Sequence, residues 1–304
     1  MAGGRYLKDR LYLYMPFFAG LLVLAMIILL LPYETVYVRD RAYLTVFLVS
    51  IVFCVSIFFV GMLFNFMVWM EGKGLKGAPE RRLLRLIAKA LRFVFSRRFG
   101  KVMSVLYSDA IHLPKLKEAS IARWFMHFLI LGGFVLTFVL DIVVTISLDF
   151  FKYQPMIDET GWAKMWLRDF AFDLTGFMIL VGLCFYAVRR FILRPKMVRT
   201  ELPDAVSVIF LLAVVLGGFI VEAFGIAGGI DGHTVNQEYS FVGYALSLLM
   251  PSSLGAYYDQ VWLIHGVMSA LLIAYIPFSK LFHMVATPIA IEAEKMLPSG
   301  VPSP

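Results

Sequence analysis

The chain has 304 residues, of which 61% are hydrophobic and 16% are charged, and its mean hydropathy is +0.82. These values exclude a soluble domain of this length. They indicate an integral membrane protein built of helices, because lipid offers no hydrogen-bond partner to unpaired backbone groups. Both cysteines, Cys54 and Cys184, lie in apolar segments, so we expect reduced thiols and neither an iron–sulfur cluster nor a zinc site within this chain.

Six apolar segments are each long enough to cross a bilayer, which takes about 20 residues. They cover residues 11–31, 43–70, 124–148, 170–189, 205–227 and 261–286. The predicted fold is therefore an all-α integral membrane protein with six transmembrane helices. We expect a single membrane domain over residues 1–304, which consists of two N-terminal spans (1–70), a basic loop (71–123), a four-helix core (124–288) and a tail (289–304).

The formal net charge of +7 is informative through its distribution. Lysine and arginine gather at the N-terminus, in the loop 71–123 and after the fourth span, and six spans place these three regions on one side. The positive-inside rule makes that side the cytoplasm, so we expect both termini inside and a multi-pass protein of the cytoplasmic membrane.

The basic loop contains a further pattern. Between residues 79 and 107, apolar side chains recur at helical spacing among the cations, which predicts an amphipathic helix on the inner membrane surface between the second and third spans. Such a helix would contact anionic lipid or provide a docking platform for a soluble partner subunit, and the two roles are compatible.

The last span carries a histidine near each end. His265 and His283 are eighteen residues apart. In a continuous helix this is about five turns and about 27 Å, close to the thickness of the hydrocarbon layer, with both rings on one face. Two imidazoles in one line, each near one membrane surface, are what a helix needs to hold two haems, one per leaflet.

His127, near the cytoplasmic start of the third span, lies at the predicted depth of His283 on a different helix. Two neutral imidazoles that face each other ligate one haem b. Arg123 and Lys280 lie one turn from these histidines and would pair with the haem propionates. The alternative is a pair of hydrogen-bonded histidines at a helix interface.

The second ligand of an outer haem stays open. His233, in the loop GGIDGHTVNQEY, is one candidate partner of His265; a ligand other than histidine, a five-coordinate iron or the absence of a second haem are the alternatives. His112 precedes a proline among charged residues, which favours a surface or interface position.

Four carboxylates lie in or next to the spans. Asp141 and Glu222 fall in the predicted outer halves of the third and fifth spans, and Asp169 and Asp173 begin the fourth. Ionisable side chains at this depth are candidates for function. If a quinol is oxidised near an outer haem, a carboxylate must take its protons, and we expect Asp141 first and Glu222 second. The alternative for Glu222 is a helix-end residue that faces interfacial water.

The segment IHGVMSALLIAYIPFSKLFH, together with RWFMH at the start of an earlier span, resembles the gamma subunits of respiratory nitrate reductase. It is more similar to the membrane cytochrome of the Dsr complex (DsrM-like) and to the membrane subunit of heterodisulfide reductase. The resemblance covers roughly residues 123–288. It implies that His265 and His283 are the paired ligands of the last helix and that His127 is a ligand on an earlier helix. The gamma subunits place two histidines on that earlier helix, whereas this chain has only His127 there.

The resemblance further implies a cytochrome b with two haems b in a respiratory complex of the sulfur-metabolism type. Such a subunit oxidises menaquinol, or reduces menaquinone, and exchanges electrons with a cytoplasmic iron–sulfur subunit of the heterodisulfide-reductase type. The expected partners are this subunit, other redox subunits and the lipid bilayer, with no nucleic acid. Two alternatives remain, namely a transporter that uses the carboxylates and histidines as a proton relay, and a haem-free membrane anchor.

Overall fold

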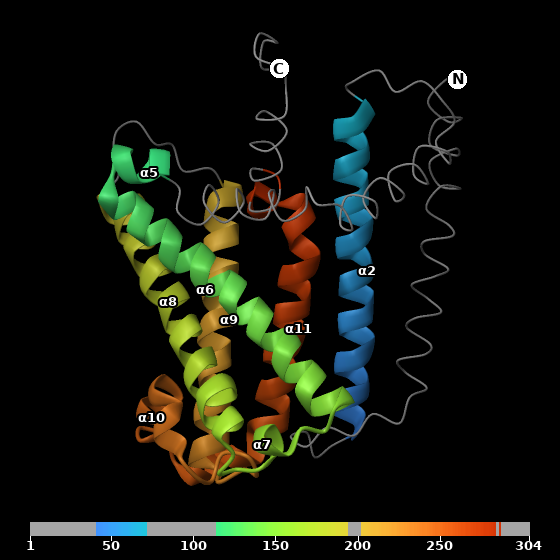
Figure 1. The fold of residues 1–304 in the computed structure, drawn as a ribbon, viewed down its shortest axis with the longest axis vertical. Helices are drawn as coiled ribbons and strands as arrows, with labels where there is room; N and C mark the ends of the chain where they lie inside the picture. Colours follow the sequence, from blue (N-terminus) through green and yellow to red (C-terminus); the bar gives the residue numbers. More distant parts are fainter. Residues whose placement is uncertain (1–40, 72–113, 194–201, 284–285, 287–304) are drawn as a thin grey trace. The chain divides into compact units, whose positions relative to one another are not determined.

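The computed structural model describes residues 41–71, 114–193, 202–283 and 286. The first predicted span (11–31), the predicted amphipathic helix (79–107), His112 and the tail lie outside the described residues. The helices are α2 (Arg41–Glu71), α5 (Pro114–Ala119), α6 (Ile121–Thr145), α7 (Gln154–Ile157), α8 (Ala171–Ala187), α9 (Leu202–Ala227), α10 (Phe241–Ser247) and α11 (Tyr258–Tyr275) (Figure 1).

Shorter turns extend several of these helices. Three are π-helical: η2 (Ile146–Phe150), η3 (Lys164–Phe170) and η4 (Val188–Ile192). Four are 3₁₀-helical: η5 (Gln237–Tyr239), η6 (Ser252–Tyr257), η7 (Ile276–Phe278) and η8 (Lys280–Phe282). Because η3 runs directly into α8, the helix that contains the fourth predicted span begins at Lys164, six residues before the predicted start.

Five helical segments of the described chain are long and apolar enough to cross a membrane: Arg41–Met62, Ile121–Leu148, Lys164–Ile192, Ala205–Ala227 and Ser252–Phe278. The prediction of a multi-pass, all-helical membrane protein is confirmed, and the described residues contain no strand. These five segments overlap the second to sixth predicted spans. The first span and the direction of insertion remain predictions.

The chain divides into two units. Among the described residues, one unit contains 41–51, 114–193 and 202–272, and we call it the larger unit; the other contains 52–71, 273–283 and 286, and we call it the smaller unit. Each unit is described by itself.

In the larger unit, α6 packs closely against α8 through small residues. A Cβ atom added to Gly133 would lie 2.7 Å from Cγ1 of Ile179, and one added to Gly182 would overlap α6 to the same degree. The hydroxyl of Thr137 donates to that of Thr175 at 2.8 Å across the same interface. Small residues and short interhelical hydrogen bonds are how helices associate in lipid, where no hydrophobic force pulls them together.

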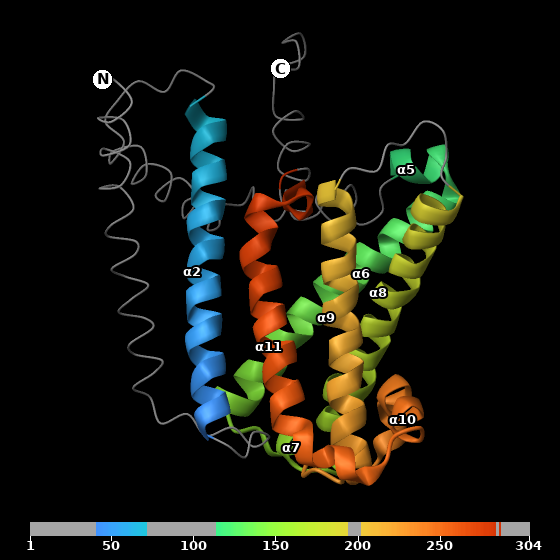
Figure 2. The same ribbon diagram turned by 180° about the vertical axis from the view of Figure 1, so that it is seen from behind.

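The other elements of the larger unit follow from this pair. α9 packs against α8, where Gly176 accommodates the ring of Phe219. The two opposite views agree that α7 and α10 lie at one end of the α6–α8–α9 group and that α5 lies at the other (Figures 1 and 2). The connections at the α7 and α10 end place loop residues beside the start of η3 and the end of α9.

In the smaller unit, the last span is not one continuous helix. α11 ends at Tyr275, η7 and η8 follow, and Ser279 between them is extended with φ −117° and ψ 174°. Pro277 explains the break, because its ring removes an N–H and clashes with the preceding turn. The prediction of an uninterrupted helix from His265 to His283, with both rings on one face, is therefore wrong.

The break is held by α2. The side-chain amide of Asn65 donates to the carbonyl of Pro277 at 2.8 Å, which satisfies an acceptor that the broken helix leaves unpaired. Gly61, one turn earlier on α2, lies against Pro277 and Phe278, where a Cβ atom would approach within 2.7 Å of the proline ring.

Candidate functional site

A short stretch of α9, from Gly217 to Gly225, organises the polar groups of the larger unit. The imidazole of His265, on α11, lies against Gly217 and Gly218. A Cβ atom on Gly217 would be 3.1 Å from Nδ1 of His265, and one on Gly218 would be 3.4 Å from Cε1 and 3.6 Å from Nε2. The two glycines therefore form a seat for the ring, and their missing side chains leave its Cε1–Nε2 edge clear on the α9 side.

The described residues do not meet the full hydrogen-bonding capacity of the His265 ring. The Val214 carbonyl, one turn before the seat, interacts with the imidazole. Nδ1 itself is buried and has no hydrogen-bond partner of acceptable geometry among the residues that the structure describes. A polar ring inside a membrane span without full compensation is expensive and marks a functional position.

His233 occupies a second position on the same helix. Its ring lies against Gly225, where an added Cβ would be 2.7 Å from Cδ2, and it contacts the ring of Tyr258 edge-on at a centroid distance of 6.0 Å. Burial, together with the positive charges of Arg168 and Lys164, lowers the pKa of His233 to about 3. The imidazole is therefore neutral at physiological pH, as a metal ligand must be.

The two seats are offset along α9. Seven to eight residues separate Gly225 from the His265 seat, which corresponds to about 10–12 Å along the helix axis. Two nitrogens on opposite faces of one iron are about 4 Å apart, twice a metal–nitrogen bond of about 2 Å. As the loop stands, His233 and His265 do not face each other across one iron. Ligation by both needs a shift of the His233 loop, and the pair remains a prediction.

Between the two seats, Glu222 of α9 meets Asp173 of α8. A Cβ atom added to Gly243 of α10 would lie 2.6 Å from Oε2 of Glu222, so the two carboxyl groups meet beside the start of α10. Oδ2 of Asp173 accepts the backbone N–H of Val242 at 2.5 Å, and the N–H of Gly243 also contributes. Two carboxylates packed against the same helix end repel each other, which favours a pair that holds at least one proton.

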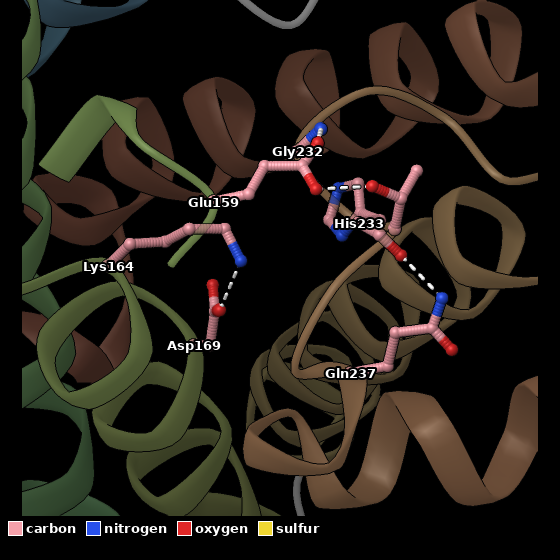
Figure 3. Close-up of polar contacts among 7 residues, drawn as sticks. Glu159, Lys164, Asp169, Gly232, His233 and Gln237 are labelled. Atoms are coloured by element: carbon pink, nitrogen blue, oxygen red, sulfur yellow. Dashed lines mark hydrogen bonds and ion pairs between the residues drawn. The ribbon is translucent and has the colours of Figure 1, made fainter. Parts of the chain in front are cut away.

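A second polar pair lies one turn earlier on the helix that contains Asp173. Lys164 and Asp169, on η3, form a buried ion pair of 2.6 Å, with exposures of 2% and 5%. Figure 3 shows the Lys164 side chain between Asp169 and Glu159 of the neighbouring loop. Burial of two charges is tolerated because each neutralises the other.

Glu159 connects this pair to the loop of His233. Its carboxylate accepts hydrogen bonds from the backbone N–H of Gly232 at 2.8 Å and from the hydroxyl of Thr234 (Figure 3). These hydrogen bonds, with the charge of Lys164, lower the pKa of Glu159. Glu159 thus fixes the loop that carries His233.

The structure places the other predicted residues of the larger unit differently. Asp141 is exposed on α6, and its side chain makes no hydrogen bond or ion pair with the described residues. His127 is half-buried near the start of α6. The guanidinium of Arg123 donates to the carbonyl of Ala119 at 3.3 Å.

In the smaller unit, His283 is exposed and ends the η8 turn. Its Nδ1 is hydrogen-bonded to the backbone carbonyl of Lys280. A carbonyl can only accept, so Nδ1 carries the proton, and in the neutral ring the lone pair lies on Nε2. This is the tautomer that a metal-binding histidine presents when a backbone carbonyl orients it.

Sequence reasoning missed the parts of this site that depend on tertiary contacts. Lys164 falls in a predicted loop, and Glu159 matches no motif. A lysine five residues before an aspartate at the start of an apolar segment could have indicated the ion pair. No pattern in the sequence could have indicated that Glu222 meets Asp173.

The fold and site define a class: a multi-pass helical membrane protein with seated histidines and protonatable groups inside its spans. Comparison with known proteins adds a relationship. The family model described as nitrate reductase gamma subunit matches residues 156–296, which include His233, His265 and His283. No solved structure matches the chain.

Curated relatives extend over more of the chain. It is 28% identical over 259 residues to a subunit of the dihydromethanophenazine:CoB–CoM heterodisulfide reductase of Methanosarcina mazei, covering 79% of this chain and 89% of the relative. The protein of the same name from Methanosarcina acetivorans is 26% identical, with coverage of 79% and 88%. An EtfAB:quinone oxidoreductase of Syntrophomonas wolfei is 24% identical over 42% of this chain and 20% of that protein. The predicted relationship to nitrate reductase gamma subunits and heterodisulfide reductase membrane subunits is confirmed.

Proposed function

We propose that this chain is the haem b-containing component for electron transfer in a respiratory membrane complex. It exchanges electrons between menaquinol or menaquinone and a cytoplasmic iron–sulfur subunit of the heterodisulfide-reductase type. The proposal is supported by relatives whose names specify a heterodisulfide reductase and a quinone oxidoreductase.

The single observation that carries the proposal is the seat of His265. An imidazole inside a membrane span and two adjacent glycines, whose side chains would otherwise crowd its Cε1–Nε2 edge, are features that suit a haem ligand. A purely structural histidine of a membrane span would instead be expected to satisfy both ring nitrogens. The residues present therefore fit a haem at His265.

In the smaller unit, the orientation of the His283 ring also suits a haem ligand. The Lys280 carbonyl fixes the His283 ring with its lone pair on Nε2, the nitrogen that faces iron in a histidine oriented from Nδ1. We propose His127 as the ligand from α6 for the same haem, with Arg123 and Lys280 near its propionates. His233 is the proposed second ligand for the haem at His265, subject to the loop movement described above.

Haem b supplies a one-electron carrier, and the protein supplies its ligands, orientation and access to protons. Carboxylates of the spans accept the protons that leave a quinol, with Asp141 and Glu222 as the proposed acceptors. The names of the relatives include dihydromethanophenazine as well as quinone. We therefore propose that this chain oxidises a membrane carrier that gives up two electrons and two protons.

The experiment is a reduced-minus-oxidised spectrum of the purified chain with pyridine haemochrome quantitation, repeated on His265→Ala and His127→Ala. We expect two haems b per chain, with one lost in each variant. Menaquinol and dihydromethanophenazine analogues are then compared as reductants, with reduced partner subunit as the reverse donor.

The absence of haem from the wild-type chain would discard the cytochrome and favour the proton-relay transporter. Haem that persists at two per chain in His265→Ala would contradict the ligand assignment. Reduction of the haems from the cytoplasmic partner alone would contradict quinol oxidation as the direction of flow.

A further inference from the structure

Glu222 lies close to the His265 seat on the same helix. Glu222 follows Gly218 by four residues, so the two positions are about 6 Å apart along the axis of α9 and differ in direction by about 40°. A two-hydrogen carrier held near the His265 ring would therefore present a hydroxyl toward the Glu222 carboxyl without leaving this face of α9.

The partner of Glu222 makes it suited to accept a proton. Asp173 is 2% exposed, and its Oδ2 is held by backbone N–H groups of α10, which stabilise a negative charge there. Its Oδ1 is buried and has no hydrogen-bond partner within the described part of the chain. A pair that holds one proton can therefore take up a second one at Oδ1 of Asp173, an oxygen that the described residues leave unsatisfied.

The same cluster offers a way out for the proton. Asp169 lies four residues, or one helical turn, before Asp173, and its charge acts on both carboxyls of the pair. Asp169 is bound to Lys164, whose ammonium group lies beside Glu159 at the loop surface (Figure 3). Charged and protonatable groups thus follow one another from Glu222 to the surface formed by the loops at the α7 and α10 end.

Resting on the proposed function, we infer that Asp173 and Glu222 act as one proton acceptor for quinol oxidation and that Asp169, Lys164 and Glu159 lead the proton to water. Oxidation of one quinol to quinone releases two electrons and two protons. The electrons pass one at a time to the haems b of the proposed function, which accept one electron each. Each proton breaks from a quinol oxygen and bonds to a carboxylate oxygen of the pair, which then consists of two carboxylic acids.

The acceptor returns to its starting state after each transfer. The added proton passes from the pair to the Asp169 carboxylate. The Lys164 ammonium then gives a proton to Glu159 and takes the one on Asp169, and Glu159 releases its proton to water, so that the pair again holds one proton before the second arrives. Before and after each transfer Lys164 neutralises Asp169, so the resting route does not hold an uncompensated carboxylate beside the pair. No other oxidant or reductant is needed.

The inference distinguishes the carboxyl pair from Asp141, the acceptor that the sequence favours. Asp141 is exposed on α6, whereas Asp173 is buried and hydrogen-bonded. Removal of the competing carboxyl, Asp141→Asn, therefore provides the decisive comparison. Asp158→Asn removes an exposed carboxyl of the loop before Lys164 and is the matched control for a change of charge on the same side.

The experiment uses the haem-loaded complex reconstituted in vesicles with menaquinol. Redox difference infrared spectra in H₂O and D₂O report protonated carboxyl groups by their C=O band and its isotope shift. Glu222→Gln and Asp173→Asn are expected to remove this band and to slow quinol-driven haem reduction by about 100-fold, the scale of a lost general base. Reduction by dithionite, which needs no proton acceptor, remains at the wild-type extent in both variants.

Three outcomes would overturn the inference. The band could disappear in Asp141→Asn instead, it could persist in Glu222→Gln, or quinol oxidation could continue at the wild-type rate in both pair variants. Failure of the proposed function would look different, since dithionite would then reveal no haem in the wild-type complex. A variant that does not fold is recognised by loss of the dithionite-reduced spectrum, and Glu222→Asp, which retains a carboxyl, then replaces it with an expected partial rate.

Discussion

The two histidines of the last span occupy different surroundings. His265 lies within a regular helix, with its ring in a glycine seat and its Nδ1 buried. His283 ends a 3₁₀ turn after a helix break, is exposed, and is oriented by the Lys280 carbonyl of its own turn. The two histidines are thus held differently. A neighbouring helix, α9, holds His265, whereas the backbone of its own turn holds His283.

This difference predicts which substitutions affect which histidine. A side chain added to α9 disturbs His265, whereas His283 responds to the contacts that hold the break at Pro277. If both respond to the same substitutions, the comparison fails. The predictions run from the largest expected effect to the smallest.

The largest effect is expected in the glycine seat. Gly217→Leu places a side chain where Nδ1 of His265 now lies, since even a Cβ atom would be only 3.1 Å away. The ring must leave its seat, and we expect loss of one haem per chain by pyridine haemochrome quantitation. Gly217→Ala should retain the haem with a shifted spectrum.

The matched control for the seat is Gly132→Ala on α6. The atoms nearest to a Cβ there are 3.9 Å away, in the side chains of Met178 and Phe128, so the methyl group fits. Haem content and spectrum should remain those of the wild type. Retention of both haems with unchanged spectra in Gly217→Leu would show that the seat has no role in ligation.

The second effect concerns the helix break. Asn65→Leu removes the donor to the Pro277 carbonyl and leaves an acceptor of the break unpaired, at a cost of about 1–3 kcal/mol. We expect a lower midpoint of thermal unfolding in detergent and a changed spectrum of the haem that His283 ligates. The spectrum of the His265 haem should not change.

Ser56→Ala serves as the control on the same helix. Its hydroxyl donates to the Val52 carbonyl four residues earlier, a bond that the helix does not need. Little change in either spectrum is expected. If Asn65→Leu behaves like Ser56→Ala, the contact with Pro277 does not position His283.

The class of the fold was readable from the sequence because it depends on composition and on the length of apolar segments. Five of the six predicted spans overlap helices that could cross a membrane. The helix break was not predicted, although Pro277 was visible, because a proline inside a membrane span is often tolerated without ending the helix. Neighbouring groups decide this, and here Asn65 stabilises the broken form.

The candidate site was readable only in part, for the same reason. The histidines and carboxylates were found because ionisable residues in apolar segments are rare and conspicuous. Their partners were not found, since Asp173 and Glu222 lie on different helices 49 positions apart in the chain and meet only after α8 and α9 pack. Long-range pairing leaves no periodic pattern in either segment.

A third and smaller effect is expected at Lys280. Its backbone orients His283, whereas its side chain is the proposed partner of a haem propionate, so Lys280→Gln leaves the orienting carbonyl in place. We expect both haems to remain, with a lowered midpoint potential for the His283 haem because a positive charge near the reduced iron is lost. Redox titration measures this. Lys152→Gln in the loop before α7 is the control for a lost cation, and loss of haem in Lys280→Gln would contradict the separation of the two roles.

The smallest effect concerns the loop of His233 and depends on pH. Hydrogen bonds from Gly232 and Thr234 hold the pKa of Glu159 below its ordinary value of about 4.3. A carboxyl whose pKa is lower in the folded state stabilises the fold above its unfolded pKa, and the contribution is lost as pH falls through the folded pKa.

The loop that carries His233 should therefore loosen as the pH falls below the ordinary pKa of a glutamate, and Glu159→Gln should loosen it already at pH 7. Hydrogen exchange of the amide of Gly232, read by mass spectrometry of peptides from this loop, checks both. Equal protection at all pH values in wild type and variant would mean that Glu159 does not hold the loop. A loosened loop also tests the second ligand: if His233 reaches the iron only after a shift, Glu159→Gln should alter the spectrum of the His265 haem and leave that of the His283 haem unchanged.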